Sequence, residues 1–362
     1  MADPVISDGA KSRVMECLDR NWISNGPVVR EFEDKLAEYC GADYCIAMNN
    51  GTSTLHALLL ALGVGPGDEV IVPDITYIST LSVILHVGAR PVIVRSDKDT
   101  FNINSEDVLA GISSATKAVL TVDMKGMPVD FDSISDVCDA SNIFFLSDSA
   151  ESLGAVYKND RVGTQASAHS FSFFANKNLF TGEGGCITTN SEWLAEELRC
   201  IRNQGQTTRY IHPKLGHNFR FNDVLASIGI DQVSKLDQTL ASKEKICRKY
   251  SKYFQSFSGE SHVSAPILPG YVTQHSWYNY CIKFESSEHC ERVKALFDER
   301  DIEWRVSFPP LTSQPLLKNY DSRVLVNPEE SSKLYSCMLD IPCHPGLTDD
   351  DVNEIIELCL AP

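Results

Sequence analysis

The sequence predicts an α/β protein with a large, mostly parallel central sheet. From about Tyr44 to Thr189, short β-branched runs alternate with amphipathic stretches, the pattern of repeated strand–helix units. Glycine and proline mark the returns from helix to strand, as in GPGDE (65–69) and GARP (88–91). The chain has 362 residues, of which 43% are hydrophobic and 22% charged, which suffices for one large core or two smaller ones.

The elements of this first part follow in order. Strands are expected at YCIAM (44–48), EVIVP (69–73), PVIV (91–94), KAVLTV (117–122) and IFFLS (143–147). Helices are expected at TLHALLLAL (54–62), ISTLSVILHV (78–87) and FDSISDVCDA (131–140).

A change of domain is expected after two longer amphipathic segments. These run from Asn222 to about Leu240 and from Ala241 to about Phe257, and the second leads into the Ser/Gly/Pro-rich stretch FSGESHVSAPILPG. We therefore divide the chain into an N-terminal and large domain, 1–240, and a smaller C-terminal α+β domain, 241–362. In the smaller domain, WYNYCIKF predicts a strand, HCERVKALFDERD a helix, and DDDVNEIIELCL a closing helix with an acidic first turn.

Charge and composition exclude several classes of partner. The sequence has 32 Lys and Arg against 49 Asp and Glu, a net charge of −17, so neither nucleic acid nor a membrane surface is expected as a partner. No signal peptide or membrane-spanning run is apparent. The twelve cysteines are scattered singly without zinc-site spacing, so we expect buried thiols, no metal site and a cytoplasmic protein.

The turn after the first strand is a candidate phosphate-binding site. Gly51, Thr52 and Ser53 stand between a strand and a helix, where free backbone N–H groups and hydroxyls can hold a phosphate. An ordinary helix N-cap explains the same residues equally well.

Two further residues favour a phosphate-binding site over an ordinary N-cap. Asp148 ends a strand at the sheet edge where parallel α/β proteins bind ligands, although a lone Asp there more often caps a turn. Lys177 lies between an aromatic run and a glycine cluster, where partial burial would favour Schiff-base chemistry over the usual solvated lysine. A phosphate-binding turn, a strand-end carboxylate and a lysine in this order are what a pyridoxal phosphate enzyme requires.

The motifs that contain these residues resemble a known family. They are WISNGPVVREFEDKLAEYCGA, NNGTSTLHALLLALGVGPGDEVIVPDITYIST, SDSAESLGA, SFSFFANKNLFTGEGG, GHNFRFND and IPCHPGLTDDDV. In this order, nearly end to end, the sequence is similar to the DegT/DnrJ/EryC1/StrS sugar-nucleotide aminotransferases. The resemblance implies the fold-type I, aspartate aminotransferase-like fold and pyridoxal 5'-phosphate as cofactor. SAES, SFFANK and RNQG resemble the branch that makes GDP-perosamine from GDP-4-keto-6-deoxymannose with L-glutamate as amino donor.

The resemblance also implies roles around the cofactor. Lys177 would be the Schiff-base lysine and proton shuttle, and Asp148 the partner of the pyridine nitrogen. The remaining cofactor-binding residues would be Gly51, Thr52, Ser53 and Ser172 at the phosphate, Tyr77 on the ring, Glu151 near the 3-hydroxyl, and Asn218.

Further residues are implied at the substrate. Trp22, Ser24 and Asn25 match a loop that borders the sugar pocket, and Arg305 matches a position near the nucleotide or the donor carboxylate. Asn218 and Arg220 match a segment that reaches across a two-fold axis, which implies a homodimer with shared active sites. Because the ligands are anionic and the chain is acidic, we expect Arg and Lys side chains, Arg220 and Arg305 among them, to converge on the cleft.

Some positions depart from the family pattern and leave other functions open. His217 replaces the usual aromatic before the Asn, Ser147 replaces the usual acidic residue before Asp148, and the C-terminal third matches weakly. The substrate could instead be a UDP- or dTDP-linked 4-keto-6-deoxyglucose. A non-catalytic, cofactor-binding regulatory protein, a general amino-acid aminotransferase and a C3 dehydratase are less favoured; the dehydratase branch has His in place of the lysine.

Overall fold

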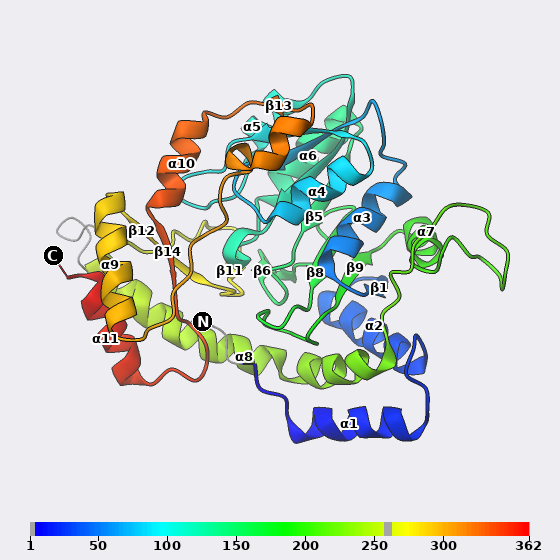
Figure 1. The fold of residues 1–362 in the computed structure, drawn as a ribbon, viewed down its shortest axis with the longest axis horizontal. Coiled ribbons are helices and arrows are strands. Elements are labelled where there is room, and N and C mark those ends of the chain that lie inside the picture. The colour runs from blue at the N-terminus through cyan, green and yellow to red at the C-terminus, as the bar shows by residue number, and fades with distance from the viewer. Residues whose placement is uncertain (1–3, 257–262, 362) are drawn as a thin grey trace.

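A large sheet with helices on both faces dominates the fold (Figure 1). The structure is a computed structural model that describes residues 4–256 and 263–361. The sheet has the strand order β1-β9-β8-β5-β4-β2-β3-β13. Its strands are β1 (Tyr44–Met48), β2 (Glu69–Pro73), β3 (Arg90–Val94), β4 (Thr116–Val122), β5 (Phe144–Asp148), β8 (Ala168–Ser172), β9 (Gly185–Thr189) and β13 (Arg323–Val324).

The sheet is mostly parallel, as predicted. Strand β9 pairs antiparallel with β1 and β8, and the other neighbouring pairs are parallel. Each of the five strands expected from the sequence occurs, with ends that agree to within one residue. Their β-branched runs are buried on both sides, which is the environment of a strand between two helical layers.

Two hydrophobic clusters fill the space between the sheet and its helices. One lies under α3 (Gly51–Ala61), α4 (Ile78–His86) and α7 (Glu192–Arg202). The other lies under α2 (Pro27–Cys40), α5 (Ser105–Gly111), α6 (Phe131–Ser141) and the first turns of α8 (Asp223–Ser256). Helix α1 (Asp8–Asp19) packs alongside α8.

The two predicted amphipathic segments after residue 222 are one helix, α8, of 34 residues, so the expected break near Leu240 was wrong. Leu236 and Leu240 belong to the core of the large sheet, whereas Cys247 and Tyr250 belong to a separate C-terminal core. The same helix therefore joins both cores. The division at residues 240 and 241 stays a prediction, and Phe257 lies outside the described residues.

The C-terminal part has its own antiparallel sheet and helices. The sheet consists of β10 (Val263–Ser264), β12 (Tyr280–Phe284) and β14 (Met338–Ile341). The helices are α9 (Ser287–Glu299), α10 (Pro328–Ser336) and α11 (Asp349–Cys359). The short strand β13 lies in the C-terminal part of the sequence but pairs with β3 at the edge of the large sheet.

Shorter elements complete the chain. A small sheet combines β6 (Val156–Tyr157), β7 (Asp160–Arg161) and β11 (Val272–Gln274), and single 3-10 turns form η1 (Met124–Gly126), η2 (Leu311–Ser313) and η3 (Pro315–Asn319). All twelve cysteines are buried and free, which confirms the prediction of buried thiols. Among the described residues, no helix is long and apolar enough to cross a membrane, and no His, Cys, Asp and Glu side chains group as metal ligands do.

Candidate active site

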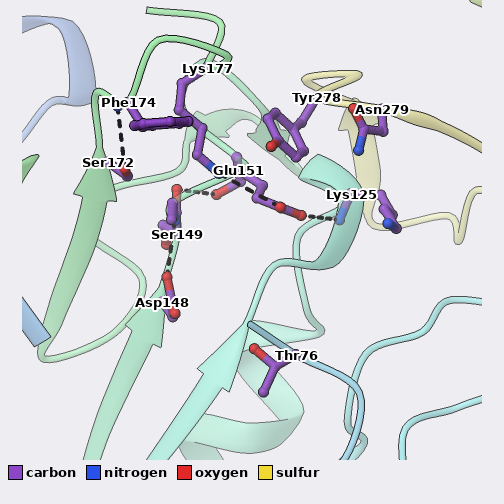
Figure 2. A network of polar contacts seen from close by, with 12 residues as sticks. Thr76, Lys125, Asp148, Ser149, Glu151, Ser172, Phe174, Lys177, Tyr278 and Asn279 are labelled. Atoms are coloured by element: carbon purple, nitrogen blue, oxygen red, sulfur yellow. Dashed lines mark hydrogen bonds and ion pairs between the residues drawn. The ribbon is translucent and has the colours of Figure 1, made fainter. Parts of the chain in front are cut away.

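The carboxyl ends of β4, β5 and β8 bring the candidate residues to one edge of the large sheet. Asp148 is the last residue of β5 and Ser172 the last residue of β8. Lys177 follows in the connection from β8 to β9, and Figure 2 shows its side chain near Glu151 and Tyr278. Parallel α/β sheets place ligands at this edge.

The candidate phosphate-binding residues adjoin one another. Helix α3 begins at Gly51, and the side chain of Asn50 caps it by accepting a hydrogen bond from the Ser53 backbone N–H at 2.8 Å. The N–H groups of Gly51 and Thr52 stand in the first turn, where a helix offers them no acceptor. A Cβ on Gly51 would lie 3.0 Å from the Ser172 Cβ, so the missing side chain leaves room between the helix end and β8.

Asp148 is a buried carboxyl group with two donors. Thr80 donates to its Oδ2 at 3.0 Å, and the backbone N–H of Ala150 donates to Oδ1 at 3.3 Å. Burial raises the pKa of Asp148 to about 6, although both hydrogen bonds and the charge of Lys177 oppose that rise. Asp148 is therefore mostly ionised at neutral pH, although its pKa lies only a little below that pH.

Lys177 has the surroundings of a reactive amine. Its Nζ lies 3.7 Å from Glu151 Oε1 and 4.0 Å from the centre of the Tyr278 ring. Burial lowers the pKa of Lys177, while the charges of Glu151 and Asp148 oppose the shift. A lower pKa increases the neutral, nucleophilic fraction of a lysine.

The contacts that fix the segment around Lys177 were not predicted from the sequence. Asn178 accepts a hydrogen bond from Lys243 Nζ at 2.8 Å and donates one to the Ser276 carbonyl oxygen at 2.7 Å. Tyr278 and Asn279, which follow in the same segment, lie beside Lys177 and Lys125 (Figure 2). These contacts join segments about 65 to 100 residues apart, so no local sequence pattern indicates them.

A cavity of about 510 Å³ opens beside Lys177. Lys235, Lys243, Arg305 and His344 also line it, and no Asp or Glu occurs among the described residues that line it. In a chain with a net charge of −17, this is a local excess of positive charge. Of the two arginines expected at the cleft, Arg305 lines this cavity and Arg220 does not.

Apart from Lys177 and Arg305, the predicted residues do not line this cavity, and this includes Asp148 and Ser172. The Tyr77 ring is 55% exposed and contacts Phe308 at 5.4 Å between ring centres. Trp22, Ser24 and Asn25 lie in the loop that leads into α2, next to the start of α8. There the Ser24 carbonyl oxygen accepts from the Asp223 N–H at 2.9 Å, and the Asn25 side chain donates to the Phe221 carbonyl oxygen at 3.3 Å.

Asn218 and Arg220 lie near the end of β1. Asn218 pairs with Asn203 through the backbone, and Arg220 pairs with Met48 in the same manner. The Arg220 guanidinium donates to Asn203 Oδ1 at 2.9 Å. Neither residue lines the cavity at Lys177 within the same chain.

Comparison with known proteins decides the family. The sequence profile of the DegT/DnrJ/EryC1/StrS aminotransferase family matches residues 4–359. The chain belongs to this family. It is a sugar aminotransferase, and its cofactor is pyridoxal phosphate.

Three relatives align with this aminotransferase over nearly its whole length. GDP-perosamine synthase of Caulobacter vibrioides is 35% identical, with 98% of this chain and 96% of the relative covered. The enzyme of the same name from Escherichia coli O157:H7 is 33% identical, with 98% and 95% covered. The putative sugar aminotransferase Spr1654 from Streptococcus pneumoniae, solved in a PMP form, superimposes with a TM-score of 0.91 at 29% identity, with 99% of this chain and 96% of that chain covered.

The residues at the sheet edge suit pyridoxal phosphate. The group needs an amine, a carboxylate for its ring nitrogen, and donors for its phosphate. Lys177 and Asp148 supply the first two from a shared buried environment. The space left by the absent Cβ of Gly51, between the first turn of α3 and Ser172, suits the third.

Proposed function

We propose that the aminotransferase moves the amino group of L-glutamate to C4 of a nucleotide-linked 4-keto-6-deoxy sugar. The sugar is GDP-4-keto-6-deoxymannose and the product is GDP-perosamine. The observation that supports this best is the cavity beside Lys177, which is lined by cations and, among the described residues, by no carboxylate. Glutamate and a nucleotide diphosphate are both anionic, so this lining matches both substrates. The names of the two GDP-perosamine synthases support the choice of base and sugar.

The roles of the residues follow from their positions. Bound pyridoxal phosphate withdraws electrons from the Cα–H bond of the donor. Lys177 accepts that proton, because its neutral amine is favoured by burial and held beside Glu151. Asp148 holds positive charge at the ring nitrogen, and the first turn of α3 with Ser172 holds the phosphate.

We further propose that two chains complete each site. Between α7 and α8 the chain forms a loop that projects from the body of the molecule (Figure 1). Leu215 on this loop is 96% exposed and Tyr210 75% exposed, and exposed apolar side chains that lie together are typical of protein contact surfaces. The loop leads into Asn218 and Arg220, so a partner that covers it would bring Arg220 close to the junction of the two chains.

The test examines the reaction with glutamate first and the choice of sugar substrate second. The enzyme is first incubated with L-glutamate alone, and the release of 2-oxoglutarate and the change in the cofactor spectrum are followed. The aminated enzyme is then freed of glutamate and supplied in turn with GDP-4-keto-6-deoxymannose, UDP-4-keto-6-deoxyglucose and dTDP-4-keto-6-deoxyglucose.

We expect the GDP sugar to restore the original spectrum fastest and to yield GDP-perosamine. A faster reaction with a UDP or dTDP sugar would assign that substrate instead. Absence of 2-oxoglutarate in the first stage would indicate a protein that binds the cofactor without catalysis.

A further inference from the structure

Lys125 is a buried lysine at the same sheet edge as Asp148. It lies in η1, directly after β4, and only 3% of it is exposed. Its Nζ is 2.7 Å from Asp340 Oδ2, and the Asn279 side chain donates to the same oxygen at 2.9 Å. Asp340 belongs to β14, so this ion pair joins the large sheet to the C-terminal sheet across 215 residues of sequence.

The backbone of Lys125 faces the reactive lysine. Its N–H donates to Glu151 Oε2 at 2.8 Å, and the other oxygen of Glu151 lies 3.7 Å from Lys177 Nζ (Figure 2). Lys125 has φ +61°, a left-handed conformation that a lysine rarely adopts. This conformation allows one residue to hold Glu151 through its main chain and Asp340 through its side chain.

Two charge pairs therefore lie next to each other: Lys177 with Glu151, and Lys125 with Asp340. A buried ion pair is a poor way to join two parts of a fold, because apolar side chains of similar volume usually stabilise such a contact as well or better. The need to join the two sheets therefore does not explain why residue 125 is a lysine. The need for a positive charge near the Lys177 amine does explain it.

We propose that Lys125 is a positioning residue of the reaction, which fixes Glu151 beside Lys177 and places a second positive charge near the Lys177 amine. This inference rests on the proposed role of Lys177 as the proton-transferring lysine. The titratable groups that face the amine are Glu151, Asp148, Lys125 and Tyr278. The adjoining cavity is lined by Lys235, Lys243, Arg305 and His344. The two carboxylates favour the ammonium form of Lys177, and Lys125 counteracts them.

The substitution Lys125→Met tests the charge and keeps the backbone. The N–H that holds Glu151 remains, while the positive charge is lost, so we expect the pKa of Lys177 to rise. At neutral pH this leaves less neutral amine and should slow the glutamate half-reaction several-fold. Lys125→Arg retains the charge and should stay close to the wild-type protein in both measurements.

The pKa of Lys177 can be measured without cofactor. Protein freed of pyridoxal phosphate is labelled with trace acetic anhydride from about pH 6 to about pH 11, and the labelled Lys177 peptide is quantified by mass spectrometry. Lys294→Met is the control, because Lys294 is a largely buried lysine in α9 that is paired with Glu291 away from the site. The control should leave the Lys177 titration where it is.

An unchanged Lys177 titration in folded Lys125→Met would overturn the proposal. If that variant does not fold, Asp340→Asn serves instead, since it keeps Lys125 and removes its counter-charge. We expect the Lys177 pKa to fall in that variant, and a rise or no change would contradict the proposal. Failure of the proposed function is distinct from these outcomes, because the wild-type enzyme would then release no 2-oxoglutarate from glutamate.

Discussion

Asp148 is buried and the Lys177 side chain is only 13% exposed, and burial changes the two groups in opposite directions. It lowers the pKa of the amine and raises that of the carboxyl group, so the neutral form of each is easier to reach in the protein than in water. The amine needs its neutral form to accept a proton, whereas the carboxylate needs its charge to hold a protonated ring nitrogen. Thr80 and the Ala150 N–H serve this second need by stabilising the charged form of Asp148.

Substitution of Lys177 by Arg tests the amine. Arginine keeps the positive charge but cannot become a neutral nucleophile at any working pH. We expect the visible absorbance of the lysine-bound cofactor and all turnover to disappear, as followed by spectroscopy and by release of 2-oxoglutarate. Lys158→Arg on the surface is the matched control, and turnover retained in Lys177→Arg would refute the assignment.

Substitution of Asp148 by Asn tests the carboxylate. We expect weaker cofactor binding and a rate lower by about 100-fold or more, because a fixed charge opposite the ring nitrogen is lost. Near-normal kinetics would contradict the role of Asp148.

The wild-type enzyme should lose cofactor affinity as the pH falls through about 6, the pKa of Asp148. The same charge has the opposite effect on folding. Since the folded pKa lies above the ordinary value, the buried charge costs stability above pH about 6. Without cofactor, Asp148→Asn should therefore resist urea better than wild type at high pH. This advantage should vanish as the pH falls below the ordinary Asp value, about 4.

At the scale of elements, α8 determines how the N-terminal helices pack. Gly229 in α8 lies so close to α2 that a Cβ there would be 2.5 Å from Phe32 Cε2. We expect Gly229→Ala to lower the free energy of unfolding by about 1–2 kcal/mol, because overpacking outweighs the gain in helix propensity. Urea unfolding measures this difference.

The control for that substitution lies on the same helix. Ser234 is exposed, and Ser234→Ala should change the free energy of unfolding by no more than about 0.5 kcal/mol. If Gly229→Ala were as harmless as the control, the close contact between α2 and α8 would not exist in solution.

The strand–helix units were predictable because burial on both faces gives each strand a continuous apolar run of its own. YCIAM and EVIVP became β1 and β2 without displacement of either end. The positions of Asp148 and Lys177 at the sheet edge were also predictable, since each stands at a boundary that the local pattern marks. Lys125 and Asp340 were not, because a buried ion pair between residues 215 apart leaves no local periodicity. The unbroken α8 was missed because its buried face passes from one core to another.

At the scale of the whole molecule, the proposed sharing of sites between two chains can be tested by mixing two inactive variants. Lys177→Arg and Arg220→Ala should each lack activity alone, because each substitution removes a required residue from both sites of its homodimer. After the two are unfolded together and refolded, hybrid dimers contain one intact site, with Lys177 from one chain and Arg220 from the other.

A one-to-one mixture should recover about a quarter of the wild-type activity, because half of the dimers are hybrids with one good site in two. The same mixture prepared without unfolding is the control and should stay inactive if the dimer exchanges slowly. Light scattering should give twice the mass of the chain. No recovery after refolding would show that each chain builds its site alone.

The pairing of β13 with β3 affects how the protein is made. Arg323 and Val324 cover the outer edge of β3, yet they are synthesised after all the other strands of the large sheet. Until then, β3 presents an unpaired, apolar strand edge to the cell, although the rest of the large sheet can already have formed. A stalled or truncated chain that ends before β13 would keep this edge open, so aggregation of nascent chains should decrease once β13 has been made.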